Sequence, residues 1–196
     1  MRKAILTLAL VLCTLTGARA SMPLLGTYTS DGNVREIRTT DNKDHNLFIS
    51  VAGEYKSDQV FLIIEEKDIP AFREALSLTR EKYHEWKTVA LTNRVTDFRK
   101  DYDIKFPPYK IGWNGANWNF TMSLRGFRMT FKTSSSGDPF SFAADKAHKW
   151  DNEYIDKKWY FILDTEEAFD EVLAAISQEN IDRALSGSTD TDSLFK

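Results

Sequence analysis

Two short apolar segments, each followed by an amphipathic helical pattern, constrain the fold more than any other feature. Residues 60–64 read Val-Phe-Leu-Ile-Ile and residues 159–163 read Trp-Tyr-Phe-Ile-Leu. Runs of this length, rich in β-branched and aromatic residues, are typical of strands covered on both faces. Apolar residues at helical spacing follow over 69–86 and 169–176. The sequence therefore predicts an α+β protein in which two amphipathic helices pack on antiparallel sheets.

The two strand-to-helix units share a layout. Ala71-Phe72 and Ala168-Phe169 stand at matching positions on the inner faces of the two helices, and the loop before the second helix is two residues shorter. One interpretation is an internal duplication, in which two similar halves pack together because each has a small core. The other is that helical periodicity alone enforces the match.

This layout divides the chain into a series of segments. The residues between the two units alternate in charge and contain Pro107-Pro108, which interrupts regular structure. The last residues are polar and without periodicity. The predicted segments are a signal peptide at 1–20, a loosely ordered lead-in at 21–33, a first sheet-plus-helix unit at 34–91, a connector at 92–112, a second sheet-plus-helix unit at 113–185 and a disordered tail at 186–196.

Alternating apolar and polar residues predict a hairpin over 117–132. Large side chains occupy every second position up to Leu124 and again from Phe127, with Arg125-Gly126 between them. A turn at Arg125-Gly126 would pair Phe120 with Phe131 and place all the large side chains on one face. We expect the opposite, polar face of this hairpin to contact water.

The first twenty residues have the organisation of a secretory signal peptide. Arg2 and Lys3 precede an apolar run, and Ala18-Arg19-Ala20 supplies a small-x-small cleavage pattern. A membrane anchor is the alternative, but the run is shorter than the roughly 20 residues that span a bilayer. A lipid anchor on Cys13 would require small residues before it. We therefore expect cleavage after Ala20, a secreted or periplasmic location, and no membrane span in the mature chain.

Export would leave a chain without cysteine, since Cys13 is the only one. Such a chain folds on its core alone, and the 5 Trp, 7 Tyr and 13 Phe supply ample aromatic area. The sequence has 26 Lys and Arg against 29 Asp and Glu, a net charge of -3, with no basic block. This balance disfavours a nucleic-acid partner.

The sequence contains no motif that indicates catalysis, a cofactor or a metal. His45, His84 and His148 are far apart, and no nucleophile elbow, phosphate-binding loop or calcium loop is present. Glu65-Glu66 and Glu166-Glu167 stand at helix starts, where negative charge is favourable without any catalytic role. We expect no bound cofactor and no bound metal.

One unusual cluster, residues 109–119, combines aromatic residues with Asn and Gly. Tryptophan rings stack on sugars and amides bond hydroxyl groups, so Tyr109, Trp113, Asn114 and Asn117 are the candidate ligand-binding residues. The alternative is a turn flanked by core tryptophans, because Asn and Gly are common turn residues. An exposed Trp113 in a concave site would favour ligand binding.

Three functions remain open at this stage. The leading hypothesis is an exported, non-enzymatic binding or assembly protein whose partner is a protein or a glycan. The first alternative is a glycan-binding module that uses the cluster at 109–119. The second is a hydrolase without a recognisable motif that uses carboxylates and His148.

Overall fold

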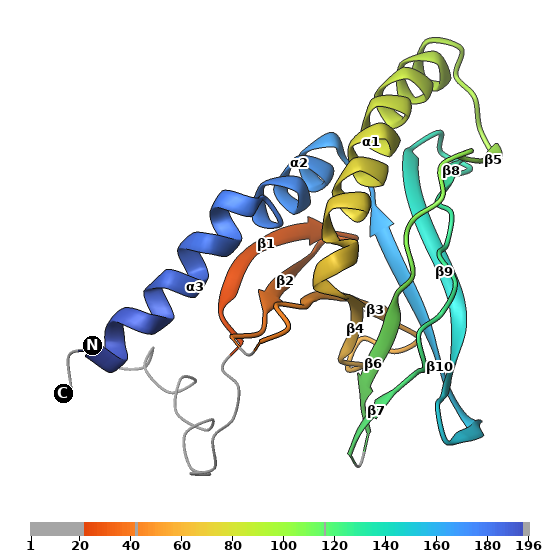
Figure 1. The fold of residues 1–196 in the computed structure, drawn as a ribbon. Coiled ribbons are helices and arrows are strands. Elements are labelled where there is room, and N and C mark those ends of the chain that lie inside the picture. Colours follow the sequence, from red (N-terminus) through yellow and green to blue (C-terminus); the bar gives the residue numbers. More distant parts are fainter. Residues whose placement is uncertain (1–21, 42, 116, 194–196) are drawn as a thin grey trace, which may run out of the picture.

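The computed structural model describes residues 22–41, 43–115 and 117–193, with side chains described up to residue 186. It confirms an α+β fold in which helices pack on antiparallel strands (Figure 1). The strands are β1 (Leu24–Ser30), β2 (Asn33–Thr39), β3 (Leu47–Gly53), β4 (Val60–Ile64), β5 (Arg99–Asp101), β6 (Lys110–Asn114), β7 (Trp118–Phe120), β8 (Thr130–Thr133), β9 (Pro139–Lys149) and β10 (Asn152–Leu163). The helices are the short 3-10 helix η1 (Glu66–Asp68), α1 (Ile69–Thr92), α2 (Glu166–Ala175) and α3 (Gln178–Ser193).

The strands follow the order β5-β8-β9-β10-β3-β4-β6-β7, with the β1–β2 hairpin attached to β3. One edge of β3 pairs with β4, and its other edge is shared by β2 along its first residues and by β10 at Ala52 and Gly53. The sheet therefore divides at β3 into two branches. The Ser30 hydroxyl joins the branches by donating to the Ile162 carbonyl at 2.7 Å.

The chain between α1 and β9 forms one long, interrupted hairpin with arms at 98–114 and 118–133. Backbone hydrogen bonds continue between β5–β8 and β6–β7, including those from Tyr102 to Met129 and from Phe106 to Phe127. Since β6 also pairs with β4 and β8 also pairs with β9, this hairpin connects the two ends of the strand order.

The predicted hairpin with its turn at Arg125-Gly126 is therefore wrong. The turn lies near Gly115, and Gly126 lies in the middle of an arm, where an added Cβ would collide with the backbone of Phe106. Gly126 is needed for this close approach of two chain segments. The interruption comes from Pro107-Pro108, which has no N–H groups to donate across the hairpin.

A single hydrophobic core lies between the helices and the inner face of the sheet. Phe72 of α1 is fully buried and contacts the rings of Phe106 and Phe161, which come from the hairpin and from β10. Tyr83 also belongs to this core, and its hydroxyl donates to the carbonyl of Asp164 at 2.8 Å. Its burial raises the pKa of the Tyr83 phenol above its usual value.

Several predicted loops are regular structure instead. The lead-in at 21–33 contains β1, which pairs with β2, and the connector at 92–112 contains β5 and part of β6. Residues 145–158, within the predicted second unit, belong to the β9–β10 hairpin. Among these residues only the small side chain of Ala147 is buried, so the apolar alternation is weak.

The predicted tail differs in the same way, because α3 extends to Ser193. Ile181 is buried, and the Asn180 amide donates to the carbonyls of Leu25 and Ala175, which anchors the start of α3 to β1 and α2. Residues 194–196 and the predicted signal peptide lie outside the described residues. The strand pairing between β3 and β10 joins the two predicted sheet-plus-helix units, and β4 pairs with β6, most of which lies in the predicted connector.

Candidate ligand-binding face

The four predicted site residues do not form one site. Tyr109 and Trp113 are each only 3% exposed and belong to the core cluster. Asn114 and Asn117 are exposed beside the β6–β7 turn. Asn117 shapes that turn, because its carbonyl accepts from the Gly115 N–H at 3.1 Å.

Strand alternation explains why Trp113 points inward. Ile111 and Trp113 alternate with Gly112 along β6, and both lie opposite core residues of β4, with Trp113 paired to Val60. The interpretation of the cluster as a turn with a core tryptophan is therefore the one that fits Trp113. The condition that would have favoured a ligand site there, an exposed Trp113, is not met.

The opposite, outer face of the same strands carries a continuous group of apolar side chains. We name this group the aromatic face, and its members are Phe48, Phe61, Ile63, Trp118 and Phe120. Ile63 is only 5% exposed yet lies outside the core cluster, which shows that its cover comes from this outer group. Trp118 remains 47% exposed and Phe120 40% exposed.

The rings of the aromatic face contact one another from β3 to β7. Ring centroids are 6.2 Å apart between Phe48 and Phe61, 5.6 Å between Phe61 and Trp118, and 6.3 Å between Trp118 and Phe120. Aromatic pairs at such spacings contribute about 0.5–1.5 kcal/mol beyond area burial. These contacts fix the orientation of the two exposed rings.

Gly112 shapes the aromatic face. In the strand register it lies between Phe61 of β4 and Phe120 of β7. A Cβ added at Gly112 would come within 2.9 Å of the Phe120 ring and 3.1 Å of the Ile63 side chain. The missing side chain thus lets the Phe120 ring lie against the strand and cover Ile63.

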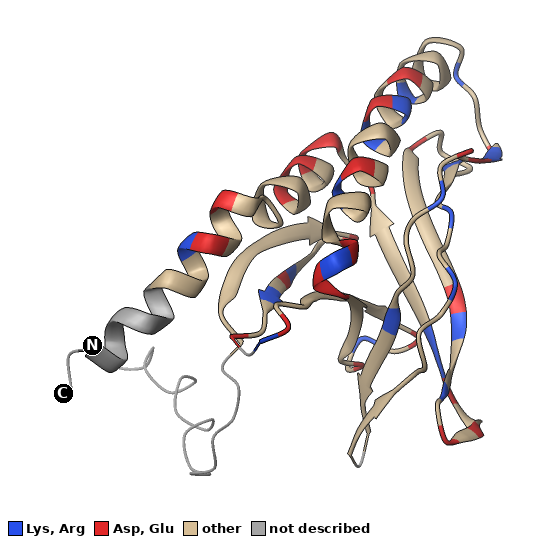
Figure 2. Ribbon diagram, viewed as in Figure 1, with Lys and Arg blue, Asp and Glu red and all other residues tan. Residues whose placement is uncertain are grey.

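Polar side chains lie at two ends of the aromatic face. At one end Glu65 accepts from Lys110 at 2.8 Å and from Lys67 at 2.6 Å. These hydrogen bonds, from Lys110 first, lower the pKa of the Glu65 carboxyl to about 2. At the other end the Asn114 amide lies 3.4 Å from Gln59 and on the strand position opposite Trp118. Figure 2 shows few charged residues along β6 and β7 between these ends.

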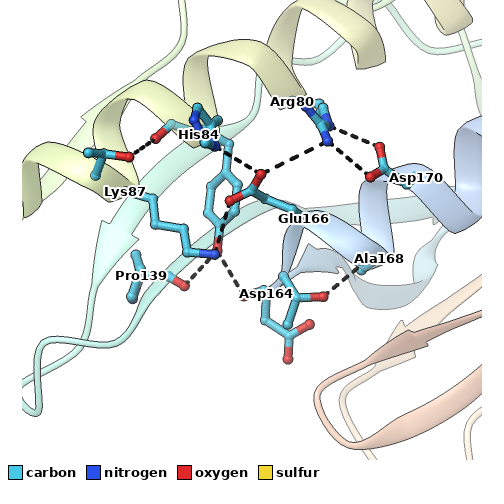
Figure 3. A network of polar contacts seen from close by, with 11 residues as sticks. Arg80, His84, Lys87, Pro139, Asp164, Glu166, Ala168 and Asp170 are labelled. Carbon is cyan, nitrogen blue, oxygen red and sulfur yellow. Dashed lines mark hydrogen bonds and ion pairs between the residues drawn. The ribbon is translucent and has the colours of Figure 1, made fainter. Parts of the chain in front are cut away.

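A separate network of ion pairs joins α1 to α2 (Figure 3). Glu166 of α2 lies 2.9 Å from His84, 3.1 Å from Lys87 and 3.9 Å from Arg80, which also forms two hydrogen bonds to Asp170. Partial burial raises the pKa of Glu166, but hydrogen bonds from Lys87 and His84 outweigh it and lower the value. The network serves to fasten two helices together.

Glu166 and Glu167 lie in the first turn of α2, as predicted. Thr165 caps the helix by accepting from the Ala168 N–H at 3.1 Å, while the Glu166 carboxylate contacts α1.

His148, the histidine of the hydrolase hypothesis, is exposed, and its Nδ1 lies 2.8 Å from the Glu153 carbonyl. Among the described residues, no group of three or more His, Cys, Asp or Glu could hold a metal, and no helix is long and apolar enough to cross a membrane.

Comparisons with protein-family models, with curated proteins and with solved structures found no match. The description of the aromatic face therefore rests on the structure alone. In the sequence, Trp118 and Phe120 alternate with polar residues, which predicts that the two rings share one face. The turn predicted at Arg125-Gly126 placed that face toward the core. The Gly-Trp-Asn-Gly-Ala-Asn segment at 112–117 was the turn signal that would have corrected the assignment.

Proposed function

We propose that this chain is an exported, non-enzymatic binding protein and that the aromatic face is its binding surface. The observation that carries the proposal is the contiguous row of rings on the outer face of the sheet, which ends in the exposed Trp118 and Phe120. Single exposed apolar residues are ordinary, whereas contiguous apolar patches mark interaction sites. Tryptophan at such a site typically contributes a large share of binding free energy.

The test compares two exposed aromatic residues. The Trp118→Ala variant removes the central ring of the aromatic face, and Tyr154→Ala removes a ring that is 89% exposed on the β9–β10 hairpin. Each mature protein is immobilised and challenged with an extract of its own cell envelope. Components retained by the wild type and by Tyr154→Ala but lost with Trp118→Ala support the proposal. Equal retention by all three proteins contradicts it.

A glycan is the ligand class with a specific observation in its favour. The amides of Gln59 and Asn114 lie beside Trp118, so a ring for stacking and groups for hydroxyl bonding occur together. This arrangement moves the proposed glycan contact from the buried Trp113 to the exposed Trp118. A glycan array with Trp118→Ala and Asn114→Ala tests it, with Trp113→Phe as the control for core effects. An array without hits removes the glycan and leaves a protein partner.

Export itself is part of the proposal and rests on the signal-peptide pattern of residues 1–20. N-terminal sequencing of the native protein should begin at Ser21. A sequence that begins at Met1, in a cytosolic fraction, would contradict the compartment and leave the binding surface to be tested separately.

A further inference from the structure

The outer face of the sheet at β5, β8 and β9 also carries aromatic rings, but charged groups lie over them. Phe140 and Phe142 of β9 lie 5.8 Å apart. The Arg99 guanidinium is 5.7 Å from the Phe142 ring centre, and the Lys132 ammonium is 5.9 Å from the Phe140 ring centre. Each cation is therefore positioned by the face of a neutral ring.

Arg99 and Lys132 are also directly opposite each other in the β5–β8 pair. Backbone hydrogen bonds at the two ends of this pair run from the Thr133 N–H to the Phe98 carbonyl and from the Tyr102 N–H to the Met129 carbonyl. Hydrogen-bonded positions alternate along an antiparallel pair. Positions 99 and 132 are thus a non-hydrogen-bonded pair, in which the side chains approach most closely. Like charges in this arrangement are destabilising.

A second opposed pair on the same outer face provides an internal comparison. Lys146 and Lys158 face each other across β9 and β10, and each has a carboxylate: Asp156 lies 2.7 Å from Lys146, and Glu54 lies 2.9 Å from Lys158. Neutralisation is the expected solution for two opposed cations.

The pair at β5–β8 has no such partner. Within the described part of the chain, no carboxylate comes within 4.0 Å of Arg99 or Lys132. Asp101 projects from the same face of β5, but its carboxylate accepts a hydrogen bond of 2.6 Å from the Thr130 hydroxyl. Two exposed cations thus lie at opposed strand positions, and neither has a carboxylate paired directly to it.

We propose that Arg99 and Lys132 bind a small oxyanion of the phosphate or sulfate type, presented free or as a group on a larger ligand. The planar guanidinium can form two parallel hydrogen bonds to such a group, and the ammonium adds a third donor. Two positive charges match a group whose charge is near minus two. The ring contacts orient both cations without cancelling their charge. This site is separate from the aromatic face.

The experiment is an NMR titration of the isotope-labelled mature protein with sodium phosphate and, separately, sodium sulfate. Sodium chloride keeps the ionic strength constant, because contacts at the surface weaken with salt. We expect saturable shifts centred on Arg99 and Lys132. The double variant Arg99→Gln/Lys132→Gln should weaken binding at least tenfold, whereas Arg99→Lys/Lys132→Arg should retain most of it. The ratio of the two affinities identifies which oxyanion the site prefers.

The matched control is Lys146→Gln/Lys158→Gln, which removes the same number of cations from the same face. It should leave the saturable shifts unchanged. Shifts that never saturate, or that decline equally in both double variants, would show general charge attraction only and overturn the proposal. As a second readout, phosphate should raise the melting temperature of the wild type but not of Arg99→Gln/Lys132→Gln at equal ionic strength. An equal rise in both would also overturn it.

Discussion

Two regions of the outer face of this sheet carry aromatic rings, yet they present different chemistry. On β3, β4 and β7 the rings contact one another and end in the exposed Trp118. On β9 the rings lie beneath Arg99 and Lys132. Figure 2 shows the same contrast, since β6 and β7 are mostly uncharged and β9 and β10 carry several charged residues. Strand alternation places a ring on a face, and the cross-strand neighbour decides whether the ring or a charge is exposed on that face.

The largest expected effect comes from removing the core that supports both faces. Phe72→Ala deletes a fully buried ring that contacts Phe106 and Phe161. We expect a loss of about 3–5 kcal/mol in the free energy of unfolding. Urea unfolding followed by circular dichroism measures it. A loss confined to one branch, seen as two separate transitions, would break the picture of one shared core.

The next effect should reach only the aromatic face. Gly112→Val places a side chain where the Phe120 ring now lies, so Phe120 must move. We expect a cost of about 1–3 kcal/mol from this overpacking and loss of any binding that requires Trp118. Chemical shifts of the Arg99 region should stay unchanged in the NMR spectrum. Shifts there would show that the two faces are coupled.

Trp118→Ala should be milder because the ring is about half exposed. It removes ring contacts with Phe61 and Phe120, and we expect a cost of about 1 kcal/mol. The same variant should abolish partner retention. Stability that falls by several kcal/mol would instead identify Trp118 as a structural residue.

The charged end of the aromatic face predicts a dependence on pH. The pKa of Glu65 falls from 4.5 to about 2 on folding because Lys110 and Lys67 bond its carboxylate. Its contribution to stability is therefore complete above pH 4.5 and is lost as the pH falls toward 2. For a pair near the surface we expect less than about 1 kcal/mol. Melting curves of wild type and Glu65→Gln should converge over this range, and parallel curves would contradict the assignment.

The smallest effect tests the opposed cations. Arg99→Gln relieves repulsion with Lys132 but loses the contact with the Phe142 ring. We expect a net change in stability within about 0.5 kcal/mol, with a gain for the variant as the salt concentration is lowered. Lys158→Gln should give no such gain, since it breaks the pair with Glu54. Equal gains from both variants would erase the distinction between the two cation pairs.

The sequence predicted the parts of the fold in which local pattern and packing agree. The apolar run at 60–64 is a central strand, and the helical stripe from Ile69 is α1. It did not predict the hairpin arms, because Arg125-Gly126 looks like a turn while the actual reason for Gly126 is a contact with Phe106, about twenty positions away. Local pattern carries no information about such an approach.

The same limit applies to the site. Period-two alternation predicts that Trp118 and Phe120 share a face, but which face depends on where the turn lies. The shift of the turn to Gly115 left Trp113 in the core and turned Trp118 outward. The cations over the β9 rings depend on the pairing of β5 with β8, which joins residues of opposite hairpin arms.

The long hairpin that links the two ends of the strand order also affects how two copies of this protein contact each other. An open sheet offers unpaired edges on which a second chain can add a strand and start aggregation. Here the hairpin arms occupy much of that edge, and β5, an end strand of three residues, carries a charge on each of them, Arg99, Lys100 and Asp101. This arrangement discourages edge-to-edge growth even at high local concentration.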